Sequence, residues 1–431
     1  MFLQSIIFTI FLSSLALSAT PDVELQLLHV VFRHGDKVPH REFQNYPNDP
    51  YRDYSYYPMG NGDLTNQGKM REYKIGTMLR ERYDQYFGPD YWPSKIYARS
   101  SEVPRTQLSL QLVLAGLFPP SEKQTWNPNL PWIPTWTFFV PYKTDNLLFP
   151  HYCYRYIEEY QRFLQLDSEK EMINKYKNVM DYLTDHTGKL INTTEAVGHL
   201  YNLLKEEVSN YFNSNKFISL SEFLSYNHFQ SAQNLTLPKW TQNVFPSPMI
   251  ELIELDFKLR SYTKTLKRLN GGMLLRKIVD DIQEHQAGKS PRDRKAFLFG
   301  GHEVNVAALA YALGTNEPTV PPYGAAIILE TLRDKKGIYY VRVLLWSGVT
   351  EQLKVQTIPN CAEICPFEDF LRIVKDVLPS DDEYYCRRDK TEDLKQNVHH
   401  RSSAACIAND KISWCIFFTV LFAFTSKFVQ K

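Results

Sequence analysis

The sequence of 431 residues predicts an α/β fold with a mainly parallel sheet and a helical insertion. Short apolar runs at 25–32, 95–100 and 295–301 each end in a polar loop. Nearly continuous apolar runs of this length are typical of strands buried on both faces of a parallel sheet. The stretch of about 150–290 is different, because it has helical periodicity and few strand-like runs. We therefore expect that stretch to be a cap of helices inserted into the α/β domain.

The first strand and the first long helix follow from local signals. The run at 25–32 is the first strand, and it stops abruptly at a polar loop. Thr65 has a side chain suited to cap a helix that runs to about Phe87. Gly88-Pro89 then ends that helix.

The later elements are predicted in the same way. Residues 95–100 form the second strand candidate, and Pro104 suits the first position of a helix through Leu117. The third strand, at 295–301, leads into a helix at 304–313 that Gly314 closes. Two further runs, at 325–332 and 338–346, flank a charged turn and predict a β-hairpin.

The composition excludes several classes of protein. Lys and Arg number 49 against 48 Asp and Glu, so the net charge is +1 and no nucleic-acid partner is expected. A hydrophobic fraction of 43% and a charged fraction of 23% exclude intrinsic disorder. The six cysteines are too few for a disulfide scaffold, and no zinc-ligand spacing is present.

The N-terminus predicts entry into the secretory pathway. Residues 1–19 contain an apolar run followed by small residues, which is the pattern of a signal peptide. The sequons at Asn192 and Asn234 become candidate glycosylation sites in that compartment. We expect an extracellular, lysosomal or cell-surface protein.

The C-terminal sequence predicts membrane anchorage, and the type of anchor stays open. A polar stalk is expected over 396–411 and an apolar segment over 412–429. This segment is marginal for the ~20 residues that span a bilayer, yet the lysines at its end suit a single-pass anchor. Small residues at 402–405 also suit a GPI-attachment signal, and a C-terminal core helix remains the third alternative.

Charged and imidazole side chains gather in three loops that follow predicted strands. In open α/β sheets, ligands bind beyond the carboxyl ends of the strands. Guanidinium groups bind phosphate oxygens, a histidine can attack phosphorus, and a carboxylic acid can protonate a departing oxygen. One of the arginines, Arg99, is as well suited to a structural salt bridge. The residues in the three loops are Arg33, His34, Lys37, Arg99, Arg105, His302 and Glu303.

Residues 33–39, Arg-His-Gly-Asp-Lys-Val-Pro, resemble the R-H-G-x-R-x-P signature of the histidine acid phosphatases. The likeness covers roughly 24–390 and is greatest to the insect secreted and venom members of that family. It implies a phosphoglycerate mutase-like three-layer domain over 20–395 with a helical cap. The other matching segments are Leu64–Gly68, Leu79–Tyr83, Arg99–Thr106, Leu237–Trp240, Gly300–Glu303 and Cys361–Pro366.

The resemblance implies an acid phosphatase that hydrolyses phosphate monoesters in two steps without metal or cofactor. His34 is the expected nucleophile, giving a phosphohistidine, and Glu303 is the expected proton donor to the leaving alcohol. An acidic optimum is expected, because Glu303 must be protonated to act and a charged His302 helps to bind a dianion. The residues expected to hold the phosphoryl oxygens are Arg33, Lys37, Arg105 and His302.

Two departures from the family pattern keep alternatives open. Lys37 stands where the signature has its second arginine, and Glu303 stands where an aspartate is commoner. A lysine keeps the charge but loses the planar fork of donors. The alternatives are a phytase-like inositol phosphate phosphatase, and a secreted phosphate-binding protein with weak or no activity.

The family pattern also suggests two disulfides, Cys361–Cys365 and Cys153–Cys386. Four cysteines allow three pairings, and the sequence alone does not choose among them. Family members are often dimers, so a homodimer stays open, although no sequence feature identifies an interface.

Overall fold

The structure is a computed structural model that describes residues 21–209, 235–348, 350 and 352–387. It divides into two compact units, Met1–Tyr384 and Tyr385–Lys431, and its described helices and strands lie in the first. The predicted signal peptide, polar stalk and C-terminal apolar segment lie outside the described residues, as does Asn234.

The described strands form one mixed sheet in the order β3-β2-β4-β1-β5-β6-β7, with β8 paired to β6. The strands from β3 to β1 pair in parallel, and the pairs from β1 through β5 and β6 to β7 are antiparallel. The α/β prediction is therefore confirmed, with the parallel part at the strands that we expected. The strands are β1 Val23–Arg33, β2 Ile96–Ser100, β3 Phe138–Phe139, β4 Ala296–Gly301, β5 Ala326–Asp334, β6 Tyr339–Trp346, β7 Leu353–Gln356 and β8 Cys365–Pro366.

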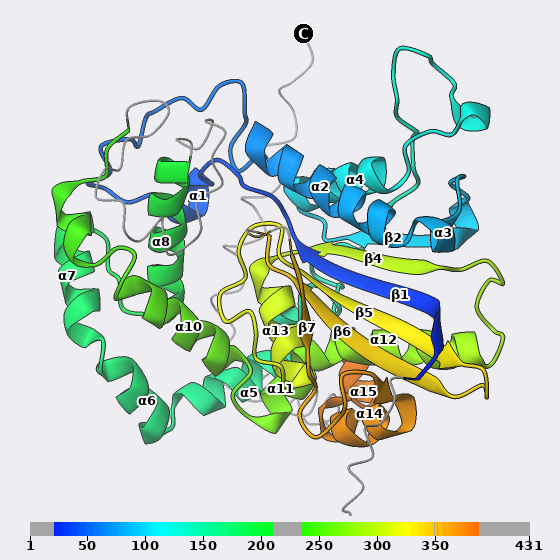
Figure 1. The fold of residues 1–431 in the computed structure, drawn as a ribbon. Helices are drawn as coiled ribbons and strands as arrows, with labels where there is room; N and C mark the ends of the chain where they lie inside the picture. The colour runs from blue at the N-terminus through cyan, green and yellow to red at the C-terminus, as the bar shows by residue number, and fades with distance from the viewer. Residues whose placement is uncertain (1–20, 210–234, 349, 351, 388–431) are drawn as a thin grey trace, which may run out of the picture. The chain divides into compact units, whose positions relative to one another are not determined.

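Helices cover both faces of the sheet (Figure 1). On one face, α2 Asn66–Arg82 and α4 Pro104–Leu117 pack on the parallel strands around a fully buried core. On the other face lie α12 Gly271–Gln286 and α13 Glu303–Leu313. The other described helices of the body are α1 Arg41–Gln44, α3 Asp84–Phe87, α14 Phe367–Val374 and α15 Asp381–Tyr384, with 3₁₀ turns at Pro93–Lys95, Glu122–Gln124, Pro150–Tyr152, Lys239–Asn243 and Lys375–Val377.

The predicted helical insertion of about 150–290 contains helices that pack in two different ways. Its helices α7, α8 and α10 share an apolar core of their own, which also includes Ala307 of α13. Helix α12 instead packs on the sheet, where Asp281 lies 3.4 Å from His29 of β1. Periodicity alone cannot separate a cap helix from a layer helix, because both bury one face. The helices of the cap are α5 Tyr154–Leu164, α6 Asp167–Asn174, α7 Lys177–Thr187, α8 Thr194–Ser209, α10 Met249–Arg260 and α11 Lys264–Leu269.

The predicted ends of most helices and strands agree with the observed ends within one or two residues. Thr65 accepts a hydrogen bond from the backbone N–H of Gly68 at 3.0 Å and so caps α2 as predicted. The predicted continuation to Phe87 is broken, since α2 ends at Arg82 and the short helix α3 follows. The predicted hairpin is β5 and β6.

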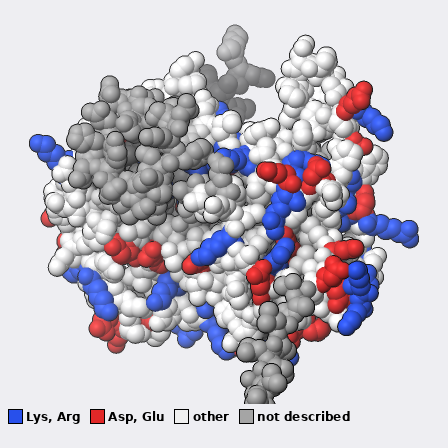
Figure 2. Space-filling model, viewed as in Figure 1, with Lys and Arg blue, Asp and Glu red and all other residues white. Residues whose placement is uncertain are grey.

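The surface carries charges of both signs with no large area of one sign on the face drawn in Figure 2. This distribution agrees with the even balance of the composition. Among the described residues, no helix is long and apolar enough to cross a membrane.

Candidate active site

The sheet brings the three predicted loops together. Arg33 at the end of β1 pairs with Gly301 at the end of β4, and Ser100 at the end of β2 pairs with Gly300. The backbone N–H groups of His34 and Ser101 then bond to the carbonyls of Gly301 and Gly300, at 3.0 and 2.9 Å. The adjacent carboxyl ends of three parallel strands thus form the floor of the site.

A close backbone contact holds the loop after β1 against the start of α2. A Cβ atom at Gly68 would lie 2.0 Å from the carbonyl oxygen of Asp36, and one at Gly35 would lie 2.4 Å from the carbonyl oxygen of Gly68. Only glycine permits this approach at either position. The Asp36 carboxylate also pairs with Arg71 of α2, so the loop is fixed by both backbone and side chain.

His34 is a buried, neutral imidazole with a defined tautomer. Its Nδ1 lies 2.9 Å from the carbonyl oxygen of Gly35, which can only accept, so Nδ1 carries the proton. Its Nε2 lies 3.0 Å from Nε of Arg105 and accepts that hydrogen bond. Burial, followed by the charges of Arg105 and Arg33, holds the pKa of His34 well below its usual value. The unprotonated nitrogen that faces Arg105 is therefore a competent nucleophile.

Arg33 is fixed on three sides. Its Nη1 donates to the carbonyl oxygen of Pro321 at 2.7 Å, and its Nε lies 3.1 Å from a carboxylate oxygen of Glu303. The guanidinium carbon lies 4.0 Å from the centre of the Tyr323 ring, in a cation–π contact. This ring also lies beside His34, with centroids 5.6 Å apart. Tyr323 was not predicted as a site residue, because no motif marks it.

His302 caps helix α13 and Glu303 is its first residue, one residue before the predicted start at Val304. The charges of these two side chains differ from expectation. Burial and the charge of Arg105 lower the pKa of His302 to about 3, so the ring is neutral. Burial alone would raise the pKa of Glu303, but the charges of Arg33 and His302 outweigh it and lower the pKa to about 2. The ligand-free site therefore holds an ionised Glu303 and a neutral His302. In the ligand-free site, His302 carries no charge that could favour an acidic optimum.

Lys37 lies at the site but is already bound by protein acceptors. Its ammonium is 2.8 Å from Oε1 of Glu206 on α8, 3.0 Å from Oε1 of Gln44 and 3.3 Å from the carbonyl of Val38. These three acceptors match the three N–H groups of an ammonium. Tyr323 also donates to Glu206, at 2.7 Å. No sequence signal marks Glu206, because its partners are distant along the chain and α8 carries no motif.

Arg99 supports the site from outside. It pairs with the buried carboxylate of Asp145, which also accepts hydrogen bonds from the backbone N–H groups of Leu147 and Leu148. The carbonyl of Leu148 accepts from Asn305 of α13 at 2.8 Å. Arg99 therefore makes the structural salt bridge that was one of its two predicted roles.

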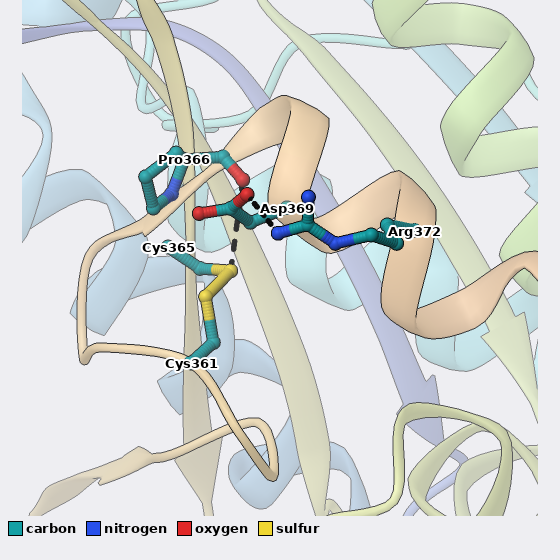
Figure 3. Close-up of a disulfide and its surroundings, with 5 residues drawn as sticks. All are labelled: Cys361, Cys365, Pro366, Asp369 and Arg372. Carbon is teal, nitrogen blue, oxygen red and sulfur yellow. Dashed lines mark hydrogen bonds and ion pairs between the residues drawn. A yellow bond between two sulfur atoms is a disulfide. The ribbon is translucent and has the colours of Figure 1, made fainter.

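One of the two predicted disulfides is present in the structure as a defined pair. Cys361 and Cys365 form a disulfide with their Cα atoms 5.5 Å apart, next to α14 (Figure 3). Cys153 and Cys386 are also disulfide-bonded, and their pairing with each other stays a prediction. Asn192 is exposed, and its glycosylation stays a prediction.

Comparison with known families identifies the family of the chain. Residues 24–346 match the family model of the histidine phosphatase superfamily (branch 2). The chain belongs to this family. The predictions of the family, the fold class and a phosphatase activity are confirmed.

Curated relatives of this histidine phosphatase include acid phosphatases. The venom acid phosphatase Acph-1 of Apis mellifera is 34% identical over 89% of this chain and 93% of its own. The prostatic acid phosphatase of Rattus norvegicus is 29% identical over 86% of this chain and 91% of its own. The lysosomal acid phosphatase of Homo sapiens is 29% identical over 84% of this chain and 80% of its own.

Solved structures with the same fold include phytases. The apo form of Hafnia alvei phytase has a TM-score of 0.57 and 16% identity, and the match covers 86% of this chain and all of that one. Its complex with myo-inositol hexakis sulphate gives 0.58. At this identity the likeness establishes the fold alone.

Proposed function

We propose that this histidine phosphatase is an acid phosphatase that hydrolyses phosphate monoesters, with Nε2 of His34 as the nucleophile. The observation that carries the proposal is the pair of hydrogen bonds on His34. Nδ1 donates to Gly35, and Nε2 keeps its lone pair beside the guanidinium of Arg105. A phosphoryl group that binds Arg105 is thereby brought next to the attacking nitrogen.

Arg33, Arg105 and His302 are the proposed phosphate ligands. Arg105 uses Nε for His34 and offers its Nη groups to phosphoryl oxygens, and Arg33 is oriented by Pro321 and Glu303. Guanidinium groups held in this way stabilise the charge that builds on phosphorus in the transition state without reorganisation. The ammonium of Lys37 already has protein acceptors, so Lys37 is not included among these direct ligands.

The proposed reaction has two steps. In the first, Nε2 forms a bond to phosphorus, the P–O bond to the leaving group breaks, and Glu303 gives its proton to the departing oxygen. In the second, Glu303 removes a proton from water, the water oxygen bonds to phosphorus, and the P–N bond breaks. The anionic phosphoryl group beside Glu303 favours the protonated carboxyl that the first step needs.

A leaving-group series tests this assignment. Glu303→Gln removes the proton donor, so hydrolysis of an alkyl phosphate should fall by 10²-fold or more. Hydrolysis of p-nitrophenyl phosphate should fall much less, because nitrophenolate leaves without a proton. His34→Ala should abolish both. Equal losses on the two substrates in Glu303→Gln would assign the proton donor elsewhere.

The proposed compartment is the secretory pathway. The signal-like segment 1–19, the exposed sequon at Asn192 and the names of the venom and lysosomal relatives support it. Glycosylation at Asn192 and Asn234, and anchorage through 412–429, belong to the same proposal.

A further inference from the structure

The ring of Tyr323 lies against two cations at the site. The guanidinium carbon of Arg33 is 4.0 Å from the ring centre, and the ammonium of Lys205 on α8 is 4.8 Å from it. Arg33 is 2% exposed and Tyr323 is 3% exposed, so water does not compete for their contact. The face of an aromatic ring attracts a cation, and this attraction is strongest where both groups are desolvated. The contact of Arg33 with the ring is therefore of the strong kind.

The Tyr323 ring is itself fixed at both ends. Its O–H donates to Oε1 of Glu206 at 2.7 Å. At the other end, the backbone N–H of Arg33 donates to the carbonyl of Ala325 at 2.9 Å, which ties the segment that carries Tyr323 to β1. The ring is thus a rigid surface on which the guanidinium rests.

The remaining contacts of Arg33 leave part of the guanidinium for a ligand. Nη1 donates to the carbonyl oxygen of Pro321 at 2.7 Å, and Nε lies 3.1 Å from the carboxylate of Glu303. None of the described residues accepts a hydrogen bond from Nη2. The attraction to the ring acts on the charge of the guanidinium as a whole, so the group is held while Nη2 keeps its donors.

We propose that Tyr323 is a positioning residue, whose ring holds the guanidinium of Arg33 with Nη2 directed to the phosphoryl group. This inference rests on the proposed phosphatase function and extends it. An aliphatic side chain would fill the same space, but it has no negative face to hold a cation. Phosphate affinity should therefore depend on the aromatic ring at position 323, and only while Arg33 is present.

The chain offers matched variants. Tyr323→Leu removes the ring, whereas Tyr323→Phe keeps it and loses only the hydrogen bond to Glu206. Tyr83→Leu is the control, because Tyr83 is also buried and its O–H also donates to a buried carboxylate, that of Glu330, at 2.7 Å. The guanidinium carbon of Arg82 lies 5.4 Å from the Tyr83 ring, and Glu330 is in the middle of β5, outside the site.

The decisive measurement is calorimetric titration of the full-length protein with inorganic phosphate. We expect the Kd to rise about tenfold in Tyr323→Leu, as for loss of a desolvated cation–π contact. It should stay within about twofold of the wild type in Tyr323→Phe and in Tyr83→Leu. A loss in Tyr323→Phe equal to that in Tyr323→Leu would overturn the inference, since the hydroxyl and not the ring would then matter.

A double-mutant cycle tests whether Tyr323 acts through Arg33. In the Arg33→Ala background, adding Tyr323→Leu should change the Kd of phosphate by no more than about twofold. The same tenfold loss in both backgrounds would overturn the inference, because it would reveal a merely structural role. Binding needs no turnover, so the two proposals can fail separately. No phosphate binding in the wild type would contradict the proposed function, whereas normal binding without a loss in Tyr323→Leu would overturn this inference alone.

Ring fluorination keeps the inference testable if Tyr323→Leu does not fold. Tyr323→Phe with increasing fluorine substitution on the ring keeps the shape and the burial, but each fluorine weakens the negative potential of the ring face. Phosphate affinity should fall stepwise along the series. An unchanged affinity across the series would overturn the inference.

Discussion

At the scale of single residues, the site keeps two imidazoles neutral by burial and by the nearby arginines. The pKa of His34 is held well below its usual value and that of His302 is lowered to about 3. For His34, neutrality is the condition for nucleophilic attack. For His302, it means that the ring brings no positive charge of its own to the phosphate site.

This arrangement has a consequence for stability against pH. A histidine whose pKa is lowered on folding binds its proton more readily in the unfolded chain, so stability falls as the pH drops below about 6.5. For His302 the fall continues to about pH 3, at ~1.4 kcal/mol per pKa unit. We expect His302→Asn to flatten the decline in unfolding free energy between pH 6.5 and 4, measured by urea titration. A decline as steep as that of the wild type would contradict the lowered pKa.

Because Lys37 and Glu206 form a buried ion pair, we expect their substitutions to change the unfolding free energy non-additively. Lys37→Met leaves a buried carboxylate without its cation and should destabilise the fold by about 3 kcal/mol. Adding Glu206→Gln should recover part of that loss, because the uncompensated charge is removed. A urea-denaturation double-mutant cycle measures the coupling. Strict additivity would mean that the two side chains do not interact in solution.

At the scale of elements, close contact between the loop after β1 and α2 sets the geometry of the nucleophile. Gly68→Ala places a Cβ atom 2.0 Å from the backbone oxygen of Asp36, and backbone cannot move aside as a side chain can. We expect a loss of about 1–3 kcal/mol in stability together with reduced kcat. Gly198→Ala in α8 is the control, since nothing lies within 4 Å of its added Cβ. Equal behaviour of the two variants would show that the contact is unimportant.

Elements that local signals define could be predicted, and long-range pairings could not. Thr65, Pro104 and Gly314 marked helix ends by capping and backbone preference, and the structure has helix ends at all three. Glu206 and Tyr323 reach the site only through the packing of the cap and of the segment before β5. No periodicity or cap reports such contacts, which depend on tertiary structure.

The charge states of the site residues also could not be predicted from the sequence. Motif matching named His302 and Glu303 but could not report that burial and Arg33 would leave one neutral and the other ionised. A pKa depends on desolvation and on distances to neighbouring charges, and both need coordinates.

At the scale of the whole molecule, an α/β body supplies the chemistry and a helical cap adjoins it. The body carries the nucleophile, both arginines and α13, while the cap reaches the site through Glu206. Glu206 pairs with Lys37, so the two side chains together add no net positive charge for the extra phosphates of an inositol polyphosphate, and we expect simple monoesters to be preferred. We expect p-nitrophenyl phosphate to be turned over with a higher kcat/KM than inositol hexakisphosphate, and the reverse order would support the phytase-like alternative.

The central claim is that Nε2 of His34 carries the phosphoryl group between the two steps. The most direct measurement is rapid mixing of the full-length enzyme with ³²P-labelled substrate, an alkaline quench that preserves phosphohistidine, and localisation of the label by peptide mapping. We predict label on the peptide containing His34, with none in His34→Ala. Turnover without label on that peptide, or label that persists in His34→Ala, would contradict the account.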